Sequence, residues 1–526
     1  MVEYLDLIMF AVACVVLIMG FPVAFSLAGV GLFFGLLGWA FGIFEPQTFF
    51  GAMPQRIFGT MTNEVLIAVP LFVFMGVMLE RSKVAEELLE NMGRLFGTLR
   101  GGLGISVSIV GMLLAASTGI VGATVVTMGL LSLPTMLRCG YNPKLACGTI
   151  CAAGTLGQII PPSIVLVLLG DVISAAFQKS QLEMGIFSPR TISVGDLFAG
   201  AMLPGLMLVG IYILYQILIA IIRPNDSPAL PKDAARADMT SWQIFAKTTH
   251  ALLPPVVLII AVLGSILAGI ASPTEAAGVG AVGSIMLAGL RLDEKHGWSI
   301  YLAAFSLIAV LVLTSVMDLR VTRTDIPGRD MLGIALAGLL TAVVLWGILI
   351  SLVRVWKRQI LRDVVRSTAQ VTSMVFVILI GAALFSLTFR GLGGEETIQQ
   401  ALTGMPGGVW GAIAIVMVIM FFLGFFLDFI EITFVVVPLV APALFTLGVD
   451  PIWLGIMIAM NLQTSFLTPP FGFALFYLRG VAPSTIQTMQ IYQGAAPFVL
   501  IQILALIILA FVPELATWLP LVIFGS

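Results

Sequence analysis

Residues 117–162 read STGIVGATVVTMGLLSLPTMLRCGYNPKLACGTICAAGTLGQIIPP, and this stretch decides the fold. A shift of 308 positions lands on residues 425–470, which read FFLDFIEITFVVVPLVAPALFTLGVDPIWLGIMIAMNLQTSFLTPP. Few side chains match, but glycines and prolines recur at this one ungapped offset: Pro134 on Pro442, Gly140 on Gly448, Pro143 on Pro451, and Pro161-Pro162 on Pro469-Pro470. Because glycine and proline fix where a chain turns or breaks, the sequence predicts one architectural unit used twice.

The composition is that of a membrane protein. Of 526 residues, 60% are hydrophobic and 10% are charged, and the mean hydropathy is +1.12. A soluble domain cannot hide this much apolar surface, so we expect an all-α polytopic protein in a lipid bilayer. The net charge of −2 gives no reason to expect nucleic acid as a partner. The N-terminal apolar run has no basic segment before it and continues past Gly35, which predicts a retained membrane segment.

Twinned, proline-broken membrane segments are the sequence pattern that points to the binding site of a transporter, so we divide the first half of the chain into scaffold helices at 1–100 and a first transport repeat at 101–195. Within 1–100, residues 7–44 form one or two crossings around Gly20-Phe21-Pro22, residues 45–63 a loop and residues 64–80 a short span. The apolar segment 105–137 is too long for one crossing and too short for two, so we expect a re-entrant hairpin. A broken helix at 145–170, interrupted at Gly154–Gly157 and Pro161-Pro162, and a loop at 171–195 complete this repeat.

The second half repeats this plan after a longer insertion. Scaffold helices and a connecting arm are expected at 196–366, and they include a polar linker at 223–249 and extra spans at 298–353. A span at 367–390 leads into a second transport repeat at 391–480, which has a hairpin at 408–445 and a broken helix at 452–478. A C-terminal helix is expected at 481–526.

Charge distribution predicts that the two repeats are inverted. The segments that flank the first hairpin carry Arg81, Lys83, Arg94, Arg100, Arg138 and Lys144. In the segments that flank the second hairpin, 391–407 and 446–451, all charged residues are acidic. Since Lys and Arg accumulate in cytoplasmic loops, the first hairpin should enter from the cytoplasm and the second from outside.

Hairpin tips that face helix breaks are expected to bind ions near the bilayer midplane. Helix C-termini and unwound carbonyls offer partial negative charge to a cation. The candidate ligands are Ser117, Thr118, Gly119, Gly157 and Pro162 in the first repeat, and Gly424, Asp428, Ser465 and Thr468 in the second. These oxygen ligands suit sodium ions better than a transition metal, which prefers His or Cys. The competing interpretation is that the small residues only allow close helix packing.

Polar side chains of the same units are assigned to substrate contact: Thr124, Thr155, Thr433, Asn461 and Gln463. Asp428 and Glu431 lie deep in an apolar run, where carboxylates are expensive and usually functional. They are candidates for sodium ligands, proton carriers or partners of backbone amides at the tip. Glu275, in SPTEAAG, is expected to cap the following helix, and Arg390 to snorkel at the end of its span.

Enzymatic motifs find no support. HExxH, GxSxG and Walker patterns are missing from any credible context, and GVGAVG at 278–283 lies within an apolar segment where helix packing explains it. Cys147 and Cys151 share a helix face without a nearby histidine, which indicates packing rather than a metal site. Without a nucleotide site, the energy for transport must come from an ion gradient.

Four ordered stretches resemble the large membrane subunit of tripartite ATP-independent periplasmic (TRAP) transporters. They are GATVVTMGLLSLPTMLRCGYNPKLACGTICAAGTLGQIIPPSIVLVLLG, LAGIASPTEAAGVGAV, GFFLDFIEITFVVVPLVAPAL and NLQTSFLTPPFGFALF. The resemblance implies an elevator mechanism, in which two hairpins and two broken helices slide through a scaffold with substrate and sodium. It also implies a bacterial inner membrane, a small four-helix membrane subunit on a separate chain, and a periplasmic binding protein that delivers an organic acid.

Carried over by motif, one sodium site uses Thr118-Gly119 with Gly157 and Pro162, and the other uses Gly424 and Asp428 with Ser465 and Thr468. The chain departs from the family pattern at Ile120 and Val121, where the tip is usually richer in serine. The spans at 298–353 resemble a longer branch associated with keto acids, mannitol or chloroaromatic compounds.

Two rival functions remain at this stage. A stand-alone sodium- or proton-coupled organic anion transporter has the same hairpin plan and needs no soluble partner. A channel or scaffold subunit needs neither ion coupling nor two broken helices, so the inverted repeat argues against it.

Overall fold

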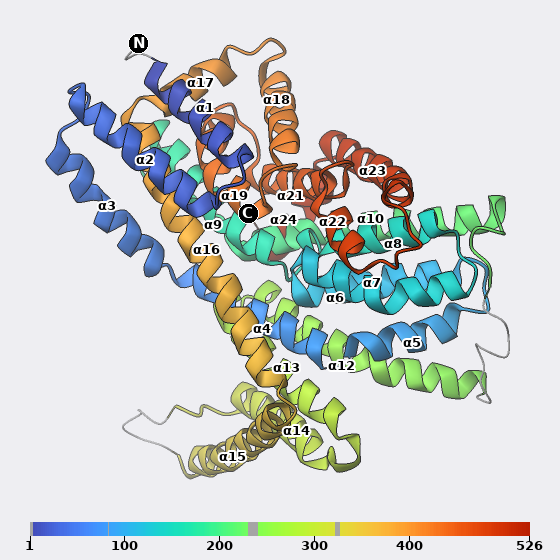
Figure 1. The fold of residues 1–526 in the computed structure, drawn as a ribbon. Helices are drawn as coiled ribbons and strands as arrows, with labels where there is room; N and C mark the ends of the chain where they lie inside the picture. The colour runs from blue at the N-terminus through green and yellow to red at the C-terminus, as the bar shows by residue number, and fades with distance from the viewer. Residues whose placement is uncertain (1–3, 83, 230–239, 321–326, 526) are drawn as a thin grey trace.

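The structure is a computed structural model that describes residues 4–82, 84–229, 240–320 and 327–525. Every regular element in these ranges is a helix, and nine helices, or up to eleven if each of two bent pairs is one span, are long and apolar enough to cross a membrane. The prediction of an all-α polytopic membrane protein is therefore confirmed. Figure 1 shows the arrangement of these helices.

Among the described residues, five helices and a short 3-10 turn precede the first hairpin. They are α1 (Leu5–Ile18), α2 (Val23–Ala40), α3 (Pro46–Met61), the 3-10 turn η2 (Glu64–Ile67), α4 (Ala68–Arg81) and α5 (Val84–Phe96). The segment 7–44 is thus two helices, and it divides at Gly20-Phe21-Pro22, where Gly20 has a φ of +83°.

The repeat predicted from glycine and proline recurs in the helix boundaries. The first unit contains α6 (Gly102–Thr118), α7 (Val121–Arg138), α8 (Pro143–Thr155), η3 (Leu156–Gln158), α9 (Ile164–Glu183) and α10 (Val194–Ile222). The second contains α17 (Gly394–Thr403), α18 (Gly408–Leu423), α19 (Phe429–Val435), α20 (Val437–Thr446), α21 (Pro451–Leu467), α22 (Phe473–Val481), α23 (Thr488–Phe511) and α24 (Glu514–Phe524). Helices α7 and α19 begin 308 positions apart, and so do α8 and α21.

Matching residues start the twinned helices α8 and α21. Each begins with proline at its first position, where the missing N–H would be unpaired in any case. The residue before it caps the helix: Asn142 accepts a hydrogen bond from the Lys144 N–H, and Asp450 from the Trp453 N–H. Both units then break at a cis prolyl-proline peptide bond, Pro161-Pro162 and Pro469-Pro470.

The two units interlock through their hairpins. Helix α7, the second arm of the first hairpin, packs on α22, which follows the break of the second unit. Helix α20, the second arm of the second hairpin, packs in turn on α9, which follows the break of the first. In Figure 1 the hairpins α6–α7 and α18–α20 approach the middle of the molecule from different sides. The breaks therefore lie in the interior, where each hairpin tip can reach one.

The base of the first hairpin is anchored to one loop. The Gly101 N–H donates to the Ser227 carbonyl oxygen at 3.0 Å, and the Asn142 N–H donates to the Asp226 carbonyl oxygen at 2.9 Å. Asn142 Nδ2 also donates to Asp226 Oδ1 at 3.0 Å. Because residues from both ends of α6–α7 bind this loop, the helix pair leaves and returns on the same side.

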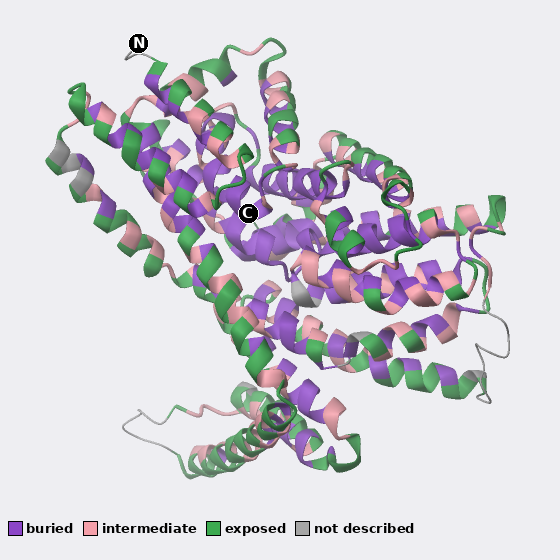
Figure 2. Cartoon of the chain, in the orientation of Figure 1, coloured by how far each residue is buried: buried purple, intermediate pink, exposed green. Residues whose placement is uncertain are grey.

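The central segment links the two units. It contains α12 (Ser241–Leu267), α13 (Pro273–Leu292), η4 (Glu294–His296), α14 (Trp298–Val316), α15 (Gly328–Lys357) and α16 (Ile360–Gly391). Helix α16 packs along α2, α3 and α4. Helices α14 and α15 pack on each other and project from the body, and Figure 2 shows α15 as mostly exposed. As predicted, Glu275 caps a helix, because it forms a capping box with Ser272 at the start of α13.

Several boundaries predicted from the sequence are wrong. The segment 45–63 holds helix α3 rather than a loop, with Pro46 at its tolerated first position and Pro54 inside it. Helix α9 continues through the predicted loop to Glu183, since its polar residues line a cavity. The single C-terminal helix expected at 481–526 is two helices, α23 and α24, divided beside Pro513. Helix α12 likewise begins inside the predicted polar linker 223–249.

Candidate functional site

The tip of the first hairpin lies against the break of its own unit. Gly119 ends α6 with a φ of +60°, and a Cβ built on it would lie 3.2 Å from the backbone N of Ile164, the first residue of α9. A Cβ on Gly157 would lie 3.3 Å from the Ala115 carbonyl oxygen of α6. Because glycine has no side chain, the backbone of the hairpin tip can approach the backbone of the helix break closely. Ser117 and Thr118 form the last turn of α6, and their side chains lie outside the described part of the structure.

The tip of the second hairpin repeats this contact with its own break. A Cβ on Gly424 would lie 2.2 Å from Ser465 Oγ, so the tip backbone sits directly on the end of α21. Ser465 Oγ donates to the Leu462 carbonyl oxygen at 2.8 Å, and Thr468 Oγ1 donates to the Thr464 carbonyl oxygen at 2.7 Å. Each hydroxyl donates its proton to a carbonyl oxygen of its own helix, so the lone pairs of the hydroxyl oxygen can still accept a hydrogen bond or coordinate a cation.

The donor atoms at the two tip–break contacts suit a hard cation. They are the last carbonyl oxygens of α6 and α21, which lack intrahelical partners and carry partial negative charge, and at the second contact also the hydroxyl oxygens of Ser465 and Thr468. Among the described residues, no group of three or more His, Cys, Asp or Glu could hold a metal ion. Oxygen ligands without His or Cys fit sodium, so the residues present are compatible with the predicted ion.

Asp428 caps a helix at the second tip. Asp428 Oδ1 accepts a hydrogen bond from the Phe429 N–H at 2.7 Å, and Glu431 Oε2 accepts one from the Asp428 N–H at 2.9 Å. The pair forms a reciprocal capping box at the start of α19. Of the three roles open to these carboxylates, the geometry shows the structural one, in which they bind backbone amides.

A cluster of neutral polar side chains lies between the two breaks. Gln463 Nε2 donates to Thr155 Oγ1 at 3.4 Å, and Gln502 Nε2 donates to the same oxygen at 3.3 Å and to the Tyr212 hydroxyl at 2.8 Å. All four side chains are fully buried. Among the described residues, Oε1 of Gln463 and of Gln502 has no hydrogen-bond partner, and neither has either amide atom of the buried Gln158 in the first break. The cluster therefore keeps unused hydrogen-bonding capacity in the interior.

Only two of the five predicted substrate residues meet in this cluster, Thr155 and Gln463. Thr124 Oγ1 donates to the Ile120 carbonyl oxygen in the first turn of α7. Asn461 Nδ2 donates to the Met417 carbonyl oxygen at 2.8 Å and so joins α21 to α18. Thr433 is buried in α19, and its hydroxyl has no hydrogen-bond partner in the part of the chain that the structure describes. Sequence reasoning missed Gln158, Gln502 and Tyr212, which lie in apolar or glycine-rich runs without a distinguishing pattern.

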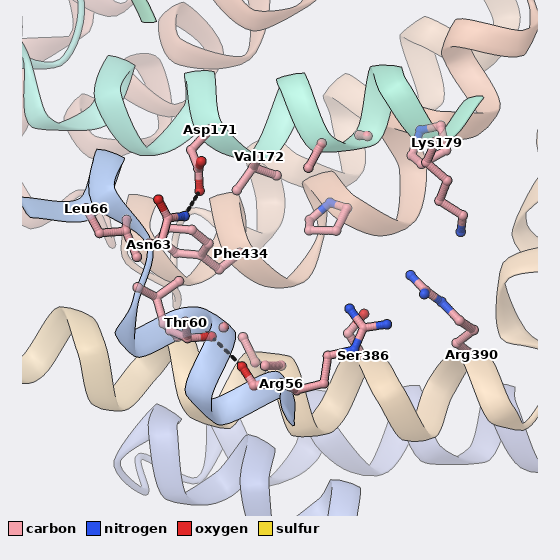
Figure 3. Close-up of a pocket in the computed structure, with 18 of the residues that line it drawn as sticks. Arg56, Thr60, Asn63, Leu66, Asp171, Val172, Lys179, Ser386, Arg390 and Phe434 are labelled. Carbon is pink, nitrogen blue, oxygen red and sulfur yellow. Dashed lines mark hydrogen bonds between the residues drawn. The ribbon is translucent and has the colours of Figure 1, made fainter. Parts of the chain in front are cut away.

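A cavity of about 490 Å³ lies beside the second hairpin, between α3 and α16 on one side and α9, α19 and α20 on the other. Three cationic side chains line it: Arg56 from α3, Lys179 from α9 and Arg390 from α16. Figure 3 shows Lys179 and Arg390 reaching toward one another from opposite walls. At the other end, Asn63 Nδ2 donates to Asp171 Oδ2 at 2.9 Å.

One carboxylate joins two of these cations. Glu395, on α17, accepts from Arg390 Nε at 2.9 Å and also forms an ion pair with Lys179. Within the described residues Arg56 makes no ion pair, and its side chain is exposed. Arg390, which was expected only to snorkel, is therefore part of a basic cavity. Asp171, Ala175 and Lys179 are spaced four residues apart, as on one face of a helix, and this spacing is the feature of the sequence that indicates a helical cavity wall. The prediction of a loop at 171–195 does not use it.

Comparison with known proteins assigns the family. The family model described as "Tripartite ATP-independent periplasmic transporter, DctM component" matches residues 10–317 and 294–515. The chain is 29% identical over 520 residues to the C4-dicarboxylate TRAP transporter large permease protein DctM of Vibrio cholerae, covering 98% of both chains. It is 26% identical to the ectoine/5-hydroxyectoine TRAP transporter large permease protein UehC of Ruegeria pomeroyi, covering 97% of both.

Two further proteins extend these similarities. The sialic acid TRAP transporter permease protein SiaT of Haemophilus influenzae is 22% identical over 508 residues, which are 96% of this chain and 67% of that protein. The crystal structure of the Alcanivorax borkumensis YdaH transporter shares the fold, with a TM-score of 0.53 over 91% of this chain and 89% of that one at 14% identity. The chain belongs to the DctM family of TRAP transporters and is a multi-pass permease subunit of the bacterial inner membrane rather than an enzyme.

Proposed function

We propose that this permease imports an organic acid, coupled to sodium, by an elevator movement of its two hairpins and two broken helices. The observation that carries the proposal is that each hairpin tip lies against the break of its own unit, while Gln463 and Thr155 connect the two breaks. Two oxygen-rich contacts on either side of a buried polar cluster are what co-transport of an ion and a polar solute requires.

The cargo is proposed to carry a carboxylate. The relatives are named for C4-dicarboxylates, ectoine and sialic acid, and each of these compounds has a carboxylate group. The basic cavity supports an anionic cargo, since a cleft lined by positive charge raises the local concentration of an anionic ligand. Inside, Thr155 and Gln463, with Gln502 and Tyr212, offer neutral donors and acceptors to the polar atoms of the cargo.

Sodium is proposed to bind at the two tip–break contacts. The first site consists of the end of α6 at Ser117, Thr118 and Gly119 with Gly157 and Pro162, and the second of Gly424 with Ser465 and Thr468. Bound sodium supplies the positive charge that a cluster of amides and hydroxyls lacks. The cargo carboxylate would then be favoured only when the ions are present, which is the physical basis of coupling.

An elevator movement is supported by a difference between the two units. On the side of the first hairpin, Thr127 Oγ1 of α7 donates to Glu80 Oε1 of α4 at 3.0 Å and bridges the two helices. By the repeat offset, α16 and the α19–α20 arm are the counterparts of α4 and α7, and between them lies the open basic cavity. We propose that the repeats at 101–195 and 391–480 move together, so that the bridge opens as the cavity closes.

Membership of a tripartite family implies two partners. We propose that they are a small four-helix membrane subunit and a periplasmic binding protein that delivers the cargo to the side of the second hairpin. The test is uptake of the binding protein's ligand into liposomes that contain the permease and the small subunit. Uptake should require inward sodium and the binding protein together. Uptake that follows a proton gradient without sodium, or that proceeds equally without the binding protein, would contradict the proposal.

A further inference from the structure

We infer that the cavity between α3, α9, α16 and α20 is a carboxylate-binding vestibule, in which a carboxylate of the cargo replaces Glu395 as the partner of Lys179 and Arg390, two of the lining cations. The inference rests on the proposed function, because it assumes an anionic cargo that enters from this side. Arg56, Lys179 and Arg390 supply its positive charge.

The lining of the cavity carries three cations and one carboxylate, Asp171, which Asn63 holds at the far end. Outside the lining, Glu395 pairs with Lys179 and Arg390, and Glu183 lies 3.6 Å from Lys179. Arg56 remains without a carboxylate among the described residues. A guanidinium presents a planar fork of donors that matches a carboxylate, so Arg56 can bind an incoming anion without displacing another carboxylate.

The size of the cavity is adequate for a small organic acid. Its volume of about 490 Å³ lies in the range of about 300–1,000 Å³ that is typical of small-molecule sites. The apolar part of the wall comes from Ala382, Ala383 and Phe434, which can cover the carbon skeleton of a ligand while the cations bind its carboxylates. The cavity therefore combines the shape and the chemistry of an anion site.

Glu395 already shows how a carboxylate binds here. Its two oxygens engage different cations, Oε1 with Arg390 and Oε2 with Lys179. Those cations belong to α16 and α9, so the shared carboxylate also ties the broken helix of the first unit to the long helix α16. A cargo carboxylate that replaces Glu395 would keep the cations paired and release α17 from them. Displacement of Glu395 by the cargo would thus remove the link between α9 and α17, so that arrival of the cargo allows α9 to move.

A purely structural ion-pair network is the alternative. Lys179 and Arg390 would then be paired by Glu395, with Glu183 also near Lys179, and the exposed Arg56 would take no part in the cavity. The two accounts differ in what removal of Arg56 does. If the ion pair is structural, the loss of Arg56 changes nothing at the cavity; if the cavity binds anions, the loss weakens binding.

The test uses a single cysteine at Ser386, which lines the cavity and is half-buried. The four native cysteines are replaced by alanine, and the purified full chain carries Ser386→Cys. The rate of modification by an anionic methanethiosulfonate is compared with that by a cationic one. Succinate and acetate are the carboxylate probes, and succinamide, the neutral diamide, is the uncharged control.

Succinate should slow the modification of Ser386→Cys, and succinamide should not. Arg56→Gln should lower the ratio of anionic to cationic modification and raise the half-protecting succinate concentration roughly tenfold, as expected for one charge-assisted contact. Glu395→Gln should shift both quantities in the opposite direction, because it frees Arg390 and leaves Lys179 with Glu183 as its remaining partner. Arg358→Gln removes the same charge from an exposed position remote from the cavity lining and should leave both quantities unchanged.

Three results would overturn the inference: succinamide protects as well as succinate, neither carboxylate protects, or Arg56→Gln behaves like Arg358→Gln. If Glu395→Gln fails to fold, Arg56→Gln still decides, because Arg56 makes no ion pair within the described residues. The measurement needs neither a gradient nor a partner. Failure of sodium-driven uptake with intact protection would therefore contradict the proposed function alone, and intact uptake without protection would contradict only the vestibule.

Discussion

Gln463 donates a hydrogen bond to Thr155 at 3.4 Å, and the two residues stand 308 positions apart, which is the offset of the internal repeat. A residue can contact its own repeat image only where the axis that relates the two units passes through the protein. The contact therefore locates this axis between the two helix breaks. Any solute bound at this cluster lies equally close to both units, so a movement that exchanges their environments exposes it first to one side and then to the other.

Thr155→Val should destabilise the protein by about 1–3 kcal/mol, because it leaves the buried amide of Gln463 without its acceptor. Valine keeps the shape but removes the oxygen that accepts from Gln463 and Gln502, and Gln502 retains the Tyr212 hydroxyl as an acceptor. The melting temperature in detergent checks this. Thr341→Val is the matched control, because the hydroxyl of this exposed residue bonds only within its own helix. Equal melting temperatures of the two variants would show that the cluster contributes no stability.

Gly424→Ala should displace the second hairpin tip, since the new Cβ would lie 2.2 Å from Ser465 Oγ. We expect a lower melting temperature and loss of uptake. Gly480→Ala, in α22, places its Cβ in open space and should be neutral. Adding Ser465→Gly to Gly424→Ala removes the clashing atoms, so the melting temperature should recover while sodium dependence does not. A stable, active Gly424→Ala variant would refute the close contact of tip and break.

Asp428→Asn should leave stability and uptake close to those of the unchanged protein, because asparagine caps helices about as well as aspartate. Asp428→Ala should lose about 0.5–2 kcal/mol of stability, the usual cost of losing such a cap. Melting temperature and uptake are measured for both variants. If Asp428→Asn folds normally but no longer transports, the carboxylate charge itself is needed, and Asp428 is an ion or proton site as well as a cap.

Ser465→Ala combined with Thr468→Ala should weaken sodium coupling and leave the protein folded. Both hydroxyls donate only to carbonyls of their own helix, so their removal leaves no buried donor without a partner. The sodium concentration that half-activates uptake should rise. Thr464→Val is a suitable control, because its hydroxyl also bonds one turn back along α21. Full sodium dependence in the double variant would mean that the second site is elsewhere.

The local architecture could be predicted from the sequence, because glycine and proline mark it directly. Pro143 and Pro451 begin the twinned helices, and Gly119 and Gly424 mark the tips that approach the breaks. Helix α3 could not be predicted in this way, since Pro46, Pro54 and its glycines argue against a helix that tertiary packing nevertheless forms.

The basic cavity could not be predicted, because it depends on contacts between residues far apart in the chain. Arg56, Lys179 and Arg390 lie on three helices, and nothing in the sequence places one beside another. The charged residues of 171–183 also favour the prediction of a loop, although this segment is the second half of α9 and one of its faces lines the cavity. The central cluster was found only in part, since Gln502 and Tyr212 lie in apolar helices beyond the repeated stretch.

The most direct test of the central claim is the melting temperature of the purified chain as sodium replaces potassium at constant ionic strength. A ligand that binds only the folded state stabilises it by about 2.7 kcal/mol at a hundredfold excess over its dissociation constant. The account predicts a rise specific to sodium, reduced in the Ser465→Ala, Thr468→Ala double variant. Identical melting temperatures in sodium and potassium would contradict the claim that the paired tips and breaks of this chain form sodium sites.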